Sequence, residues 1–187
     1  MRTVFFDVDT QIDFMLPTGA LYVPGAEKLV PTIARLNADA LASGMPLIST
    51  MDAHRENDVE FLSWPPHCVT GCLGQRKATP IAAGAVTVSL TAPCPDVRQA
   101  KHIIVEKVTV DCFTNPHLAE VLAQLGADRY VVYGVVTEIC VQNALFGLLK
   151  TGKPVTMLSN AVKELNSAAA EAMLAKFTAL GGEVASA

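Results

Sequence analysis

Short apolar runs alternate with amphipathic stretches along most of the chain. The runs are rich in valine and isoleucine, which is typical of strands buried on both faces of a sheet. They occupy residues 4–8, 46–51, 102–107, 130–133 and 154–158, with shorter candidate strands at 85–90 and 183–185. Between them, apolar residues recur at helical spacing over residues 26–43, 115–126, 139–150 and 167–180. This alternation predicts an α/β fold, a three-layer, open, mostly parallel sheet with helices on both faces.

Length and composition narrow the picture further. The 187 residues suit one α/β domain, residues 1–187, and are too few for two. Apolar residues make up 51% and charged residues 17%, which fits a covered sheet and leaves apolar surface for a partner subunit, so we expect a homo-oligomer. A net charge of -4 without a run of Lys or Arg argues against nucleic-acid and membrane partners. The expected ligand is therefore a small molecule.

The cellular compartment is predicted from the N-terminal sequence and the cysteines. Asp7 and Asp9 interrupt the first apolar run, which therefore does not resemble a signal peptide, and no stretch has the length of a membrane span. The five cysteines are an odd number, which favours reduced thiols over a disulfide framework. We expect a cytoplasmic protein.

Three predicted strands end in a charged side chain. Asp9 follows the run 4–8, Asp52 follows the run 46–51, and Lys107 ends the run 102–107. The carboxyl ends of parallel strands share one edge of the sheet, where open α/β sheets bind ligands. One such residue alone is more simply a turn or a solvated strand end. Three together predict the mouth of a site.

Cys140 is the candidate nucleophile. It follows the apolar run 130–133, which Gly134 is expected to end, and Thr137 is a plausible N-cap of the helix after it. In the first turn of that helix, free backbone N–H groups and the positive dipole end favour a thiolate and provide donors for an oxyanion. The alternative is a small buried cysteine that only packs the helix.

A candidate metal site follows the second strand. Asp52 and His54 are two residues apart, so their side chains project to the same side of an extended segment. His67 follows two prolines, which stiffen its backbone. One carboxylate and two imidazoles suit Zn, Fe or Mn, and Asp58 or Glu60 could add a fourth ligand. A loop salt bridge is the simpler alternative for Asp52 and His54.

Other candidates have weaker support from the sequence. Cys68 and Cys72 lie near His67, but two thiolates would close the metal site, so we expect them to be free thiols. Cys94 and Cys112 have no predicted role. Phe14 is expected either in the core or in the wall of a pocket, and Phe113 is expected to line a pocket.

Taken together, these motifs resemble the isochorismatase-like cysteine hydrolases, and within them the nicotinamidases. The resemblance covers nearly the whole length. The stretches that carry it are Asp9–Phe14, Asp52–His54, Ser63–Gly71, Lys107 and Gly134–Val141. The first and last stretches are typical of the superfamily, whereas the Asp-x-His and Pro-Pro-His segments are typical of its metal-binding amidase branch.

The resemblance implies a mechanism and a set of residues. The triad would be Asp9, Lys107 and Cys140, and the metal, with zinc favoured, would be held by Asp52, His54 and His67. A cis peptide between Val135 and Val136 would turn the Val136 N–H toward the Cys140 N–H as an oxyanion hole. Phe14 and Trp64 would sandwich the ring of the substrate. The implied reaction is hydrolysis of nicotinamide to nicotinate and ammonia through a thioester.

The sequence also departs from the family pattern. The usual Asn after Gln is Ile12, the aromatic residue inside Asp-x-His is Ala53, the following Pro is Arg55, and Cys72 replaces a Thr. These changes leave open a related cysteine amidase that acts on another small carboxamide or ureido compound. A non-catalytic binding relative is the other alternative.

Overall fold

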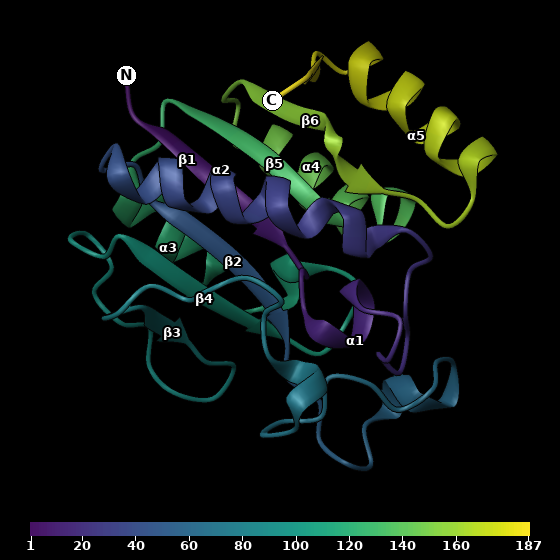
Figure 1. Cartoon of the computed structure of the whole chain (residues 1–187). Helices are drawn as coiled ribbons and strands as arrows, with labels where there is room; N and C mark the ends of the chain where they lie inside the picture. The colour runs from purple at the N-terminus through teal and green to yellow at the C-terminus, as the bar shows by residue number, and fades with distance from the viewer.

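The computed structural model describes residues 1–187, and a seven-stranded sheet forms its centre (Figure 1). The strands are β1 Thr3–Val8, β2 Leu47–Asp52, β3 Val86–Val88, β4 His102–Lys107, β5 Arg129–Val135, β6 Val155–Lys163 and β7 Glu183–Ala185. Their order across the sheet is β3-β4-β2-β1-β5-β6-β7, and every neighbouring pair is parallel. The predicted open α/β sheet is confirmed.

Helices cover both faces of the sheet. The α-helices are α1 Ile12–Met15, α2 Val30–Ala42, α3 Leu118–Leu125, α4 Gln142–Leu149 and α5 Ser167–Ala179. The shorter turns are η1 Ala26–Leu29, η2 Val59–Leu62, η3 Leu73–Gln75 and η4 Cys112–Thr114, which are 3-10 helical, and η5 Thr137–Val141, which is a π-helical turn. Figure 1 shows α2 in front of the sheet and α3 and α4 behind it.

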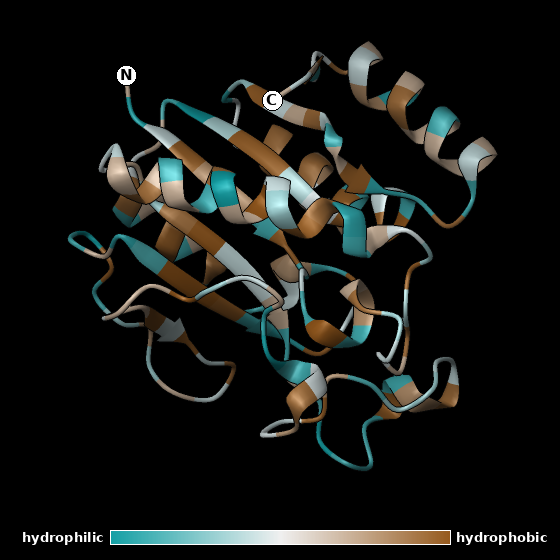
Figure 2. Ribbon diagram, viewed as in Figure 1, coloured by the Kyte–Doolittle hydropathy of each residue, from teal (hydrophilic) through white to brown (hydrophobic).

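Each face of the sheet has its own apolar core. Residues of α1 and α2 pack on one face with Tyr133 and Val135 of β5, and residues of α3, α4 and α5 pack on the other. The central strands are mostly brown in Figure 2, whereas α2 is banded with teal, as expected when one side of a helix faces water. No helix of this chain has the apolar length that crossing a membrane requires.

Several element boundaries differ from the predicted ones. The α-helical part of the segment 26–43 begins only at Val30, which is one of the two effects expected of Pro31, a late start or a kink, because proline suits the first turn of a helix and not its interior. The helix expected from Asn115 begins at Leu118, because the Asn115 side chain accepts the N–H of His117 at 2.9 Å. Strand β6 continues past residue 158 to Lys163 and carries an irregularity in its pairing with β5.

Gly134 lies inside β5 and does not end it. The strand continues to Val135, and Gly134 pairs with Val8 of β1 at a φ of 123°. A Cβ at this position would lie 2.1 Å from the carbonyl oxygen of Val8. Glycine is therefore required for close approach of the two backbones, which corrects its predicted role as a terminator.

The strand order explains how distant residues meet. Strands β1, β2 and β4 are neighbours, and Asp52 is paired directly with Lys107 in the register of β2 and β4. Asp9 follows the end of β1 on the other side of β2. The three charged strand ends are therefore brought to one edge of the sheet, as the sequence pattern predicts.

Candidate active site

Lys107 occupies the centre of the cluster at this edge. Its side chain is fully buried, and its Nζ lies 2.9 Å from Oδ2 of Asp9 and 4.0 Å from Sγ of Cys140. The same ammonium donates hydrogen bonds to Oδ1 of Asp52 and, at 2.9 Å, to the carbonyl oxygen of Thr109. The structure thus brings together the three residues of the expected triad and links them to Asp52.

Asp9 is held in a backbone conformation that few non-glycine residues adopt. Its φ is 50°, in the left-handed region. Thr50 of β2 stabilises this turn, because its hydroxyl accepts the N–H of Asp9 at 3.1 Å and donates to Oδ1 of Asp9 at 2.6 Å. The other carboxylate oxygen of Asp9 faces Lys107.

Cys140 lies in the π-helical turn that joins β5 to α4. The carbonyl oxygen of Val136 accepts the N–H groups of both Ile139 and Val141 at 3.1 Å, which widens this first turn. Thr137 is not the N-cap, because the turn begins after Val136, and the buried Thr137 hydroxyl makes no hydrogen bond. Cys140 is nevertheless in the first turn after a strand, as predicted.

The protonation states differ from the simple dipole argument. Burial raises the pKa of the Cys140 thiol well above its usual value; Lys107 opposes this effect and Asp9 adds to it. Burial also raises the pKa of Asp9, again against the effect of Lys107. The resting cysteine is thus a thiol and not the expected thiolate, since desolvation outweighs the helix dipole. The raised pKa makes the Asp9 carboxylate a better proton acceptor than an ordinary aspartate.

The backbone before Cys140 has the cis peptide expected at the oxyanion hole. The peptide between Val135 and Val136 is cis, as the resemblance implies. The N–H of Val136 donates to no acceptor in the protein, and Val136 lines the same pocket as Cys140.

Asp52, His54 and His67 form a compact, buried cluster next to the triad. Oδ2 of Asp52 lies 3.7 Å from Nε2 of His54 and 3.7 Å from Nε2 of His67. One potential ligand atom from each of the three residues lies within 4.8 Å of the others. Burial opposes the ionisation of Asp52, but Lys107 and the two imidazoles hold the pKa of that carboxyl well below its usual range.

The cluster fits a divalent metal ion. Nδ1 of His67 lies 2.7 Å from the carbonyl oxygen of Pro65, and Nδ1 of His54 lies 3.1 Å from Oδ2 of Asp58, so each Nε2 faces Asp52. Nε2 of His54 is buried and makes no hydrogen bond. A buried, unpaired imidazole nitrogen beside a carboxylate is typical of a metal ligand, and this donor set suits Zn, Fe or Mn.

The two candidates for a fourth ligand occupy different places. Asp58 contacts the far nitrogen of His54, so it orients the imidazole and does not extend the ligand set, as carboxylates commonly do behind metal-binding histidines. Glu60 lines the pocket beside Asp52, and burial and the charge of Asp52 raise the pKa of Glu60.

Cys140 of the triad and Asp52 and His67 of the metal-ligand cluster line one pocket. It is lined by Phe14, Leu21, Val23, Asp52, Glu60, Trp64, His67, Val110, Val136, Ile139, Cys140 and Leu165. Most of these side chains are apolar, and the few polar ones converge near Cys140, which is typical of a site for a small, mostly apolar ligand. The expected ring-binding residues Phe14 and Trp64 are both in the wall.

Gln11 contributes to the site, although it is not among the predicted site residues. Its side-chain amide makes hydrogen bonds with both backbone groups of Asp52: Oε1 accepts the N–H of Asp52 at 2.7 Å, and Nε2 donates to the carbonyl oxygen of Asp52 at 2.9 Å. The same Nε2 donates to the carbonyl oxygen of Gln75 at 2.8 Å. Gln11 thus ties the loop after β1 to the metal-ligand strand. The signals for it in the sequence are its place in the stretch Asp9–Phe14 and its position two residues after Asp9.

Glu138 also has a structural role that its position does not predict. Its Oε1 accepts the N–H of Leu165 at 3.0 Å and the N–H of Asn166 at 2.7 Å. Leu165 forms part of the pocket wall, so Glu138 anchors the loop after β6 beside Cys140. The residues that it joins are far apart in the sequence, which leaves no local signal.

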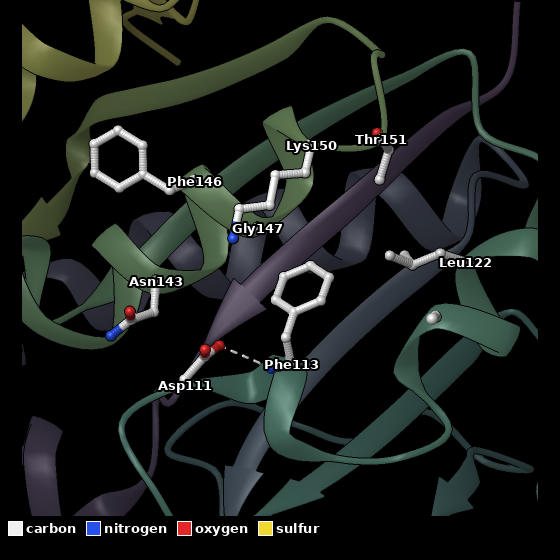
Figure 3. A pocket seen from close by; sticks show the side chains of 9 residues that line it. Asp111, Phe113, Leu122, Asn143, Phe146, Gly147, Lys150 and Thr151 are labelled. Carbon is white, nitrogen blue, oxygen red and sulfur yellow. Dashed lines mark hydrogen bonds between the residues drawn. The ribbon is translucent and has the colours of Figure 1, made fainter.

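A second hollow lies between η4, α3 and α4, away from the triad (Figure 3). Phe113 projects into it, so the expectation that Phe113 lines a pocket is correct, but the pocket is not the one at Cys140. Asp111 accepts the N–H of Phe113 at 2.9 Å and fixes this turn. The ring packs against Gly147, where a Cβ would lie 2.1 Å from it.

Comparison with known proteins places this geometry in a family. A pyrazinamidase from Pyrococcus horikoshii, solved in complex with zinc, superposes with a TM-score of 0.86 at 26% identity, and each chain is covered completely (100%). The nicotinamidase of Acinetobacter baylyi is 25% identical over 183 residues, which are 85% of this chain and 80% of the relative. The nicotinamidase of Saccharomyces cerevisiae is 23% identical over 186 residues, 84% of this chain and 86% of the relative. The sequence profile of the Isochorismatase domain matches residues 3–187, and the chain therefore belongs to the isochorismatase family.

Proposed function

We propose that the chain is a cysteine amidohydrolase that converts nicotinamide to nicotinate and ammonia. The observation that carries the proposal is the shared position of Lys107, which contacts Asp9 and Cys140 on one side and Asp52 of the metal-ligand cluster on the other. The similarity to nicotinamidases and to a zinc-containing pyrazinamidase supports the same assignment.

The first half of the reaction forms a thioester. Asp9 accepts the proton of the Cys140 thiol, and the Lys107 ammonium stabilises the thiolate. The thiolate attacks the carboxamide carbon, and the N–H groups of Val136 and Cys140 stabilise the resulting oxyanion. Asp9 then returns its proton to the amide nitrogen, the C–N bond breaks, and ammonia leaves.

The second half releases the acid. Asp9, again a carboxylate, removes a proton from water, and the water oxygen attacks the thioester carbon. The C–S bond breaks, and the Cys140 sulfur recovers a proton from Asp9. Because the pKa of Asp9 is raised, it is suited to accept and return a proton in both halves.

Asp52, His54 and His67 would hold a divalent ion, with zinc favoured over iron or manganese. When bound, the ion would supply an anchor for the pyridine nitrogen of the substrate. Phe14 and Trp64 would position the ring by stacking, so that the carboxamide meets Cys140.

The departures from the family pattern lie outside the pocket at Cys140. Ile12 and Ala53 do not line the pocket at Cys140, and Ala53 and Arg55 line a different hollow. Cys72 is exposed. The shape of the catalytic pocket therefore does not depend directly on these changes.

The experiment that tests the function is ammonia release from nicotinamide by the purified chain, compared with the Cys140→Ala variant. We expect stoichiometric nicotinate and ammonia from the native chain and none from the variant. Absence of product from the native, metal-loaded chain would refute the proposal.

A further inference from the structure

Cys94, His117 and Glu120 form a second group of potential metal ligands. One ligand atom from each residue lies within 4.8 Å of the other two, as in the cluster around Asp52. None of the three residues lines the pocket at Cys140. Cys94 comes from the loop between β3 and β4, whereas His117 and Glu120 belong to the start of α3. No residue of the proposed reaction takes part in this group.

The helical half of the group is rigidly placed. His117 and Glu120 are three residues apart, so their side chains share one side of the helix. The N–H of His117 donates to Oδ1 of Asn115 at 2.9 Å. The Asn115 amide in turn donates to the carbonyl oxygens of Val88 at 3.2 Å and Glu106 at 2.8 Å. The start of α3 is thereby anchored to both β3 and β4.

Gln124 fixes the Cys94 loop against α3. Its Oε1 accepts the N–H of Val97 at 2.8 Å, and its Nε2 donates to the carbonyl oxygen of Pro95 at 3.2 Å. The same Nε2 lies 3.8 Å from Sγ of Cys94 and 3.3 Å from Oε1 of Glu120. A neutral N–H donor therefore approaches both the sulfur and the carboxylate, at distances longer than strong hydrogen bonds. The Cys94 sulfur and the Glu120 carboxylate would both favour a cation, but their neighbour is only the neutral amide of Gln124.

No cationic side chain neutralises this group. Glu120 takes part in none of the ion pairs of the structure. A divalent ion would supply the missing positive charge and displace the thiol proton, because metal ligation requires the thiolate.

We propose that Cys94, His117 and Glu120 bind a divalent transition-metal ion at a site separate from that of Asp52, His54 and His67. Sulfur and imidazole ligands favour zinc or cobalt over magnesium or calcium. Ligand bonds of about 2.0–2.3 Å require the donor atoms to move closer together, which the exposed Glu120 side chain permits by rotation. Three protein ligands leave one tetrahedral position for water. The ion would cross-link the loop between β3 and β4 to α3.

Cobalt binding distinguishes this site from the proposed catalytic one. A cobalt–thiolate bond gives a near-ultraviolet charge-transfer band, whereas a site of one carboxylate and two imidazoles gives none. The His54→Ala variant, in which the first site is disrupted, should therefore bind one cobalt ion per chain and show the band. Adding Cys94→Ala should abolish the band, and adding the matched change at an exposed cysteine, Cys72→Ala, should leave it intact.

Metal content gives a second readout that is independent of activity. Zinc-loaded native chain should contain two ions, His54→Ala one, and His54→Ala with His117→Ala none, as measured by elemental analysis after removal of free metal. His117→Ala changes a partly exposed side chain and provides the test if Cys94→Ala fails to fold. A missing band in the His54→Ala chain, a band that survives Cys94→Ala, or a His54→Ala chain that holds no zinc ion would overturn the proposal. A chain that holds two ions but lacks amidase activity would refute the proposed function alone.

Discussion

Lys107 and Asp52 are paired in the register of neighbouring strands, and the Lys107 ammonium donates to Oδ1 of Asp52 while it lies 2.9 Å from Oδ2 of Asp9. One buried cation therefore serves two buried carboxylates with different proposed roles. Burial alone would lower the pKa of Lys107, but the two carboxylates raise it well above its usual value. The lysine stays charged, and both carboxylates depend on it.

Replacing Lys107 with methionine should therefore affect both stability and catalysis. The variant leaves two buried carboxylates without their cation, which should reduce the free energy of unfolding by about 3–5 kcal/mol. Ammonia release should be lost as well. Urea unfolding and the amidase assay measure the two effects, with Lys101→Met at an exposed position as the control. An active Lys107→Met chain of native stability would contradict the arrangement.

Cys140→Ala should reduce turnover by a factor on the order of 10³ or more, because no other thiol reaches the substrate pocket. Folding and metal content should be unchanged, since Cys140 is not a proposed ligand. The exposed Cys72→Ala variant is the matched control and should keep full activity. Retained turnover in Cys140→Ala would eliminate this cysteine as the nucleophile.

Asp58→Asn tests how the proposed ligand His54 is oriented. The change keeps the size of the side chain but weakens its contact with Nδ1 of His54, so metal affinity should fall about 10- to 100-fold. His54→Ala should lose the first-site ion and raise the KM for nicotinamide. Titration with a metal chelator measures the affinities. Equal affinity in the native chain and Asp58→Asn would argue against this role of Asp58.

Substrate choice should depend on the ring nitrogen. Nicotinamide and pyrazinamide carry a nitrogen meta to the carboxamide, whereas benzamide keeps the shape and the scissile bond but lacks that nitrogen. A site built around the nitrogen should favour the first two by several kcal/mol in kcat/KM. Equal turnover of benzamide would show that the metal does not orient the ring. Turnover of an acyclic amide alone would favour the related-amidase alternative.

His102 predicts how stability changes with pH. Burial lowers the pKa of His102 to about 4 from an ordinary value of 6.5, with a further contribution from Lys77. The contribution of His102 to the free energy of unfolding is therefore complete above pH 6.5 and is lost as the pH falls toward 4, because the unfolded chain binds a proton at a higher pH than the folded chain does. Between pH 7 and pH 5, the titration of His102 should lower the free energy of unfolding by about 2 kcal/mol.

The measurement compares unfolding free energies of the native chain and His102→Gln at both pH values. Glutamine can replace the contacts of the imidazole, which lies 2.9 Å from the Ser49 hydroxyl and accepts the N–H of Ala82 at 3.2 Å. The variant should lose about 2 kcal/mol less than the native chain on acidification. Equal losses would show that His102 does not control this transition.

The sequence predicts the sheet and its functional edge because both depend on local patterns. Apolar runs locate the strands, and parallel pairing brings the residues that follow them, Asp9, Asp52 and Lys107, to one edge. Tertiary contacts are not encoded in this way. Thr50 supports Asp9 from a neighbouring strand, and Glu138 binds Leu165 across 27 positions of sequence, so no short-range period reveals either.

The protonation state of Cys140 could not be predicted from the sequence for a related reason. Its position after a strand indicates a helix start, but its burial depends on the whole pocket, and burial dominates its pKa. The π-helical form of the turn is likewise invisible to a helical period. The homo-oligomeric state and the cytoplasmic location stay predictions.

Gly134 links backbone packing to reactivity. It pairs β5 with Val8, so the strand that leads into Cys140 lies against the strand that leads into Asp9, and any side chain at this position would meet the Val8 carbonyl. Proton transfer between the Cys140 sulfur and the Asp9 carboxylate therefore depends on the absence of a Cβ at Gly134. A single added carbon at Gly134, which lies outside the pocket, would push β5 away from β1 and so separate the Cys140 thiol from the Asp9 carboxylate.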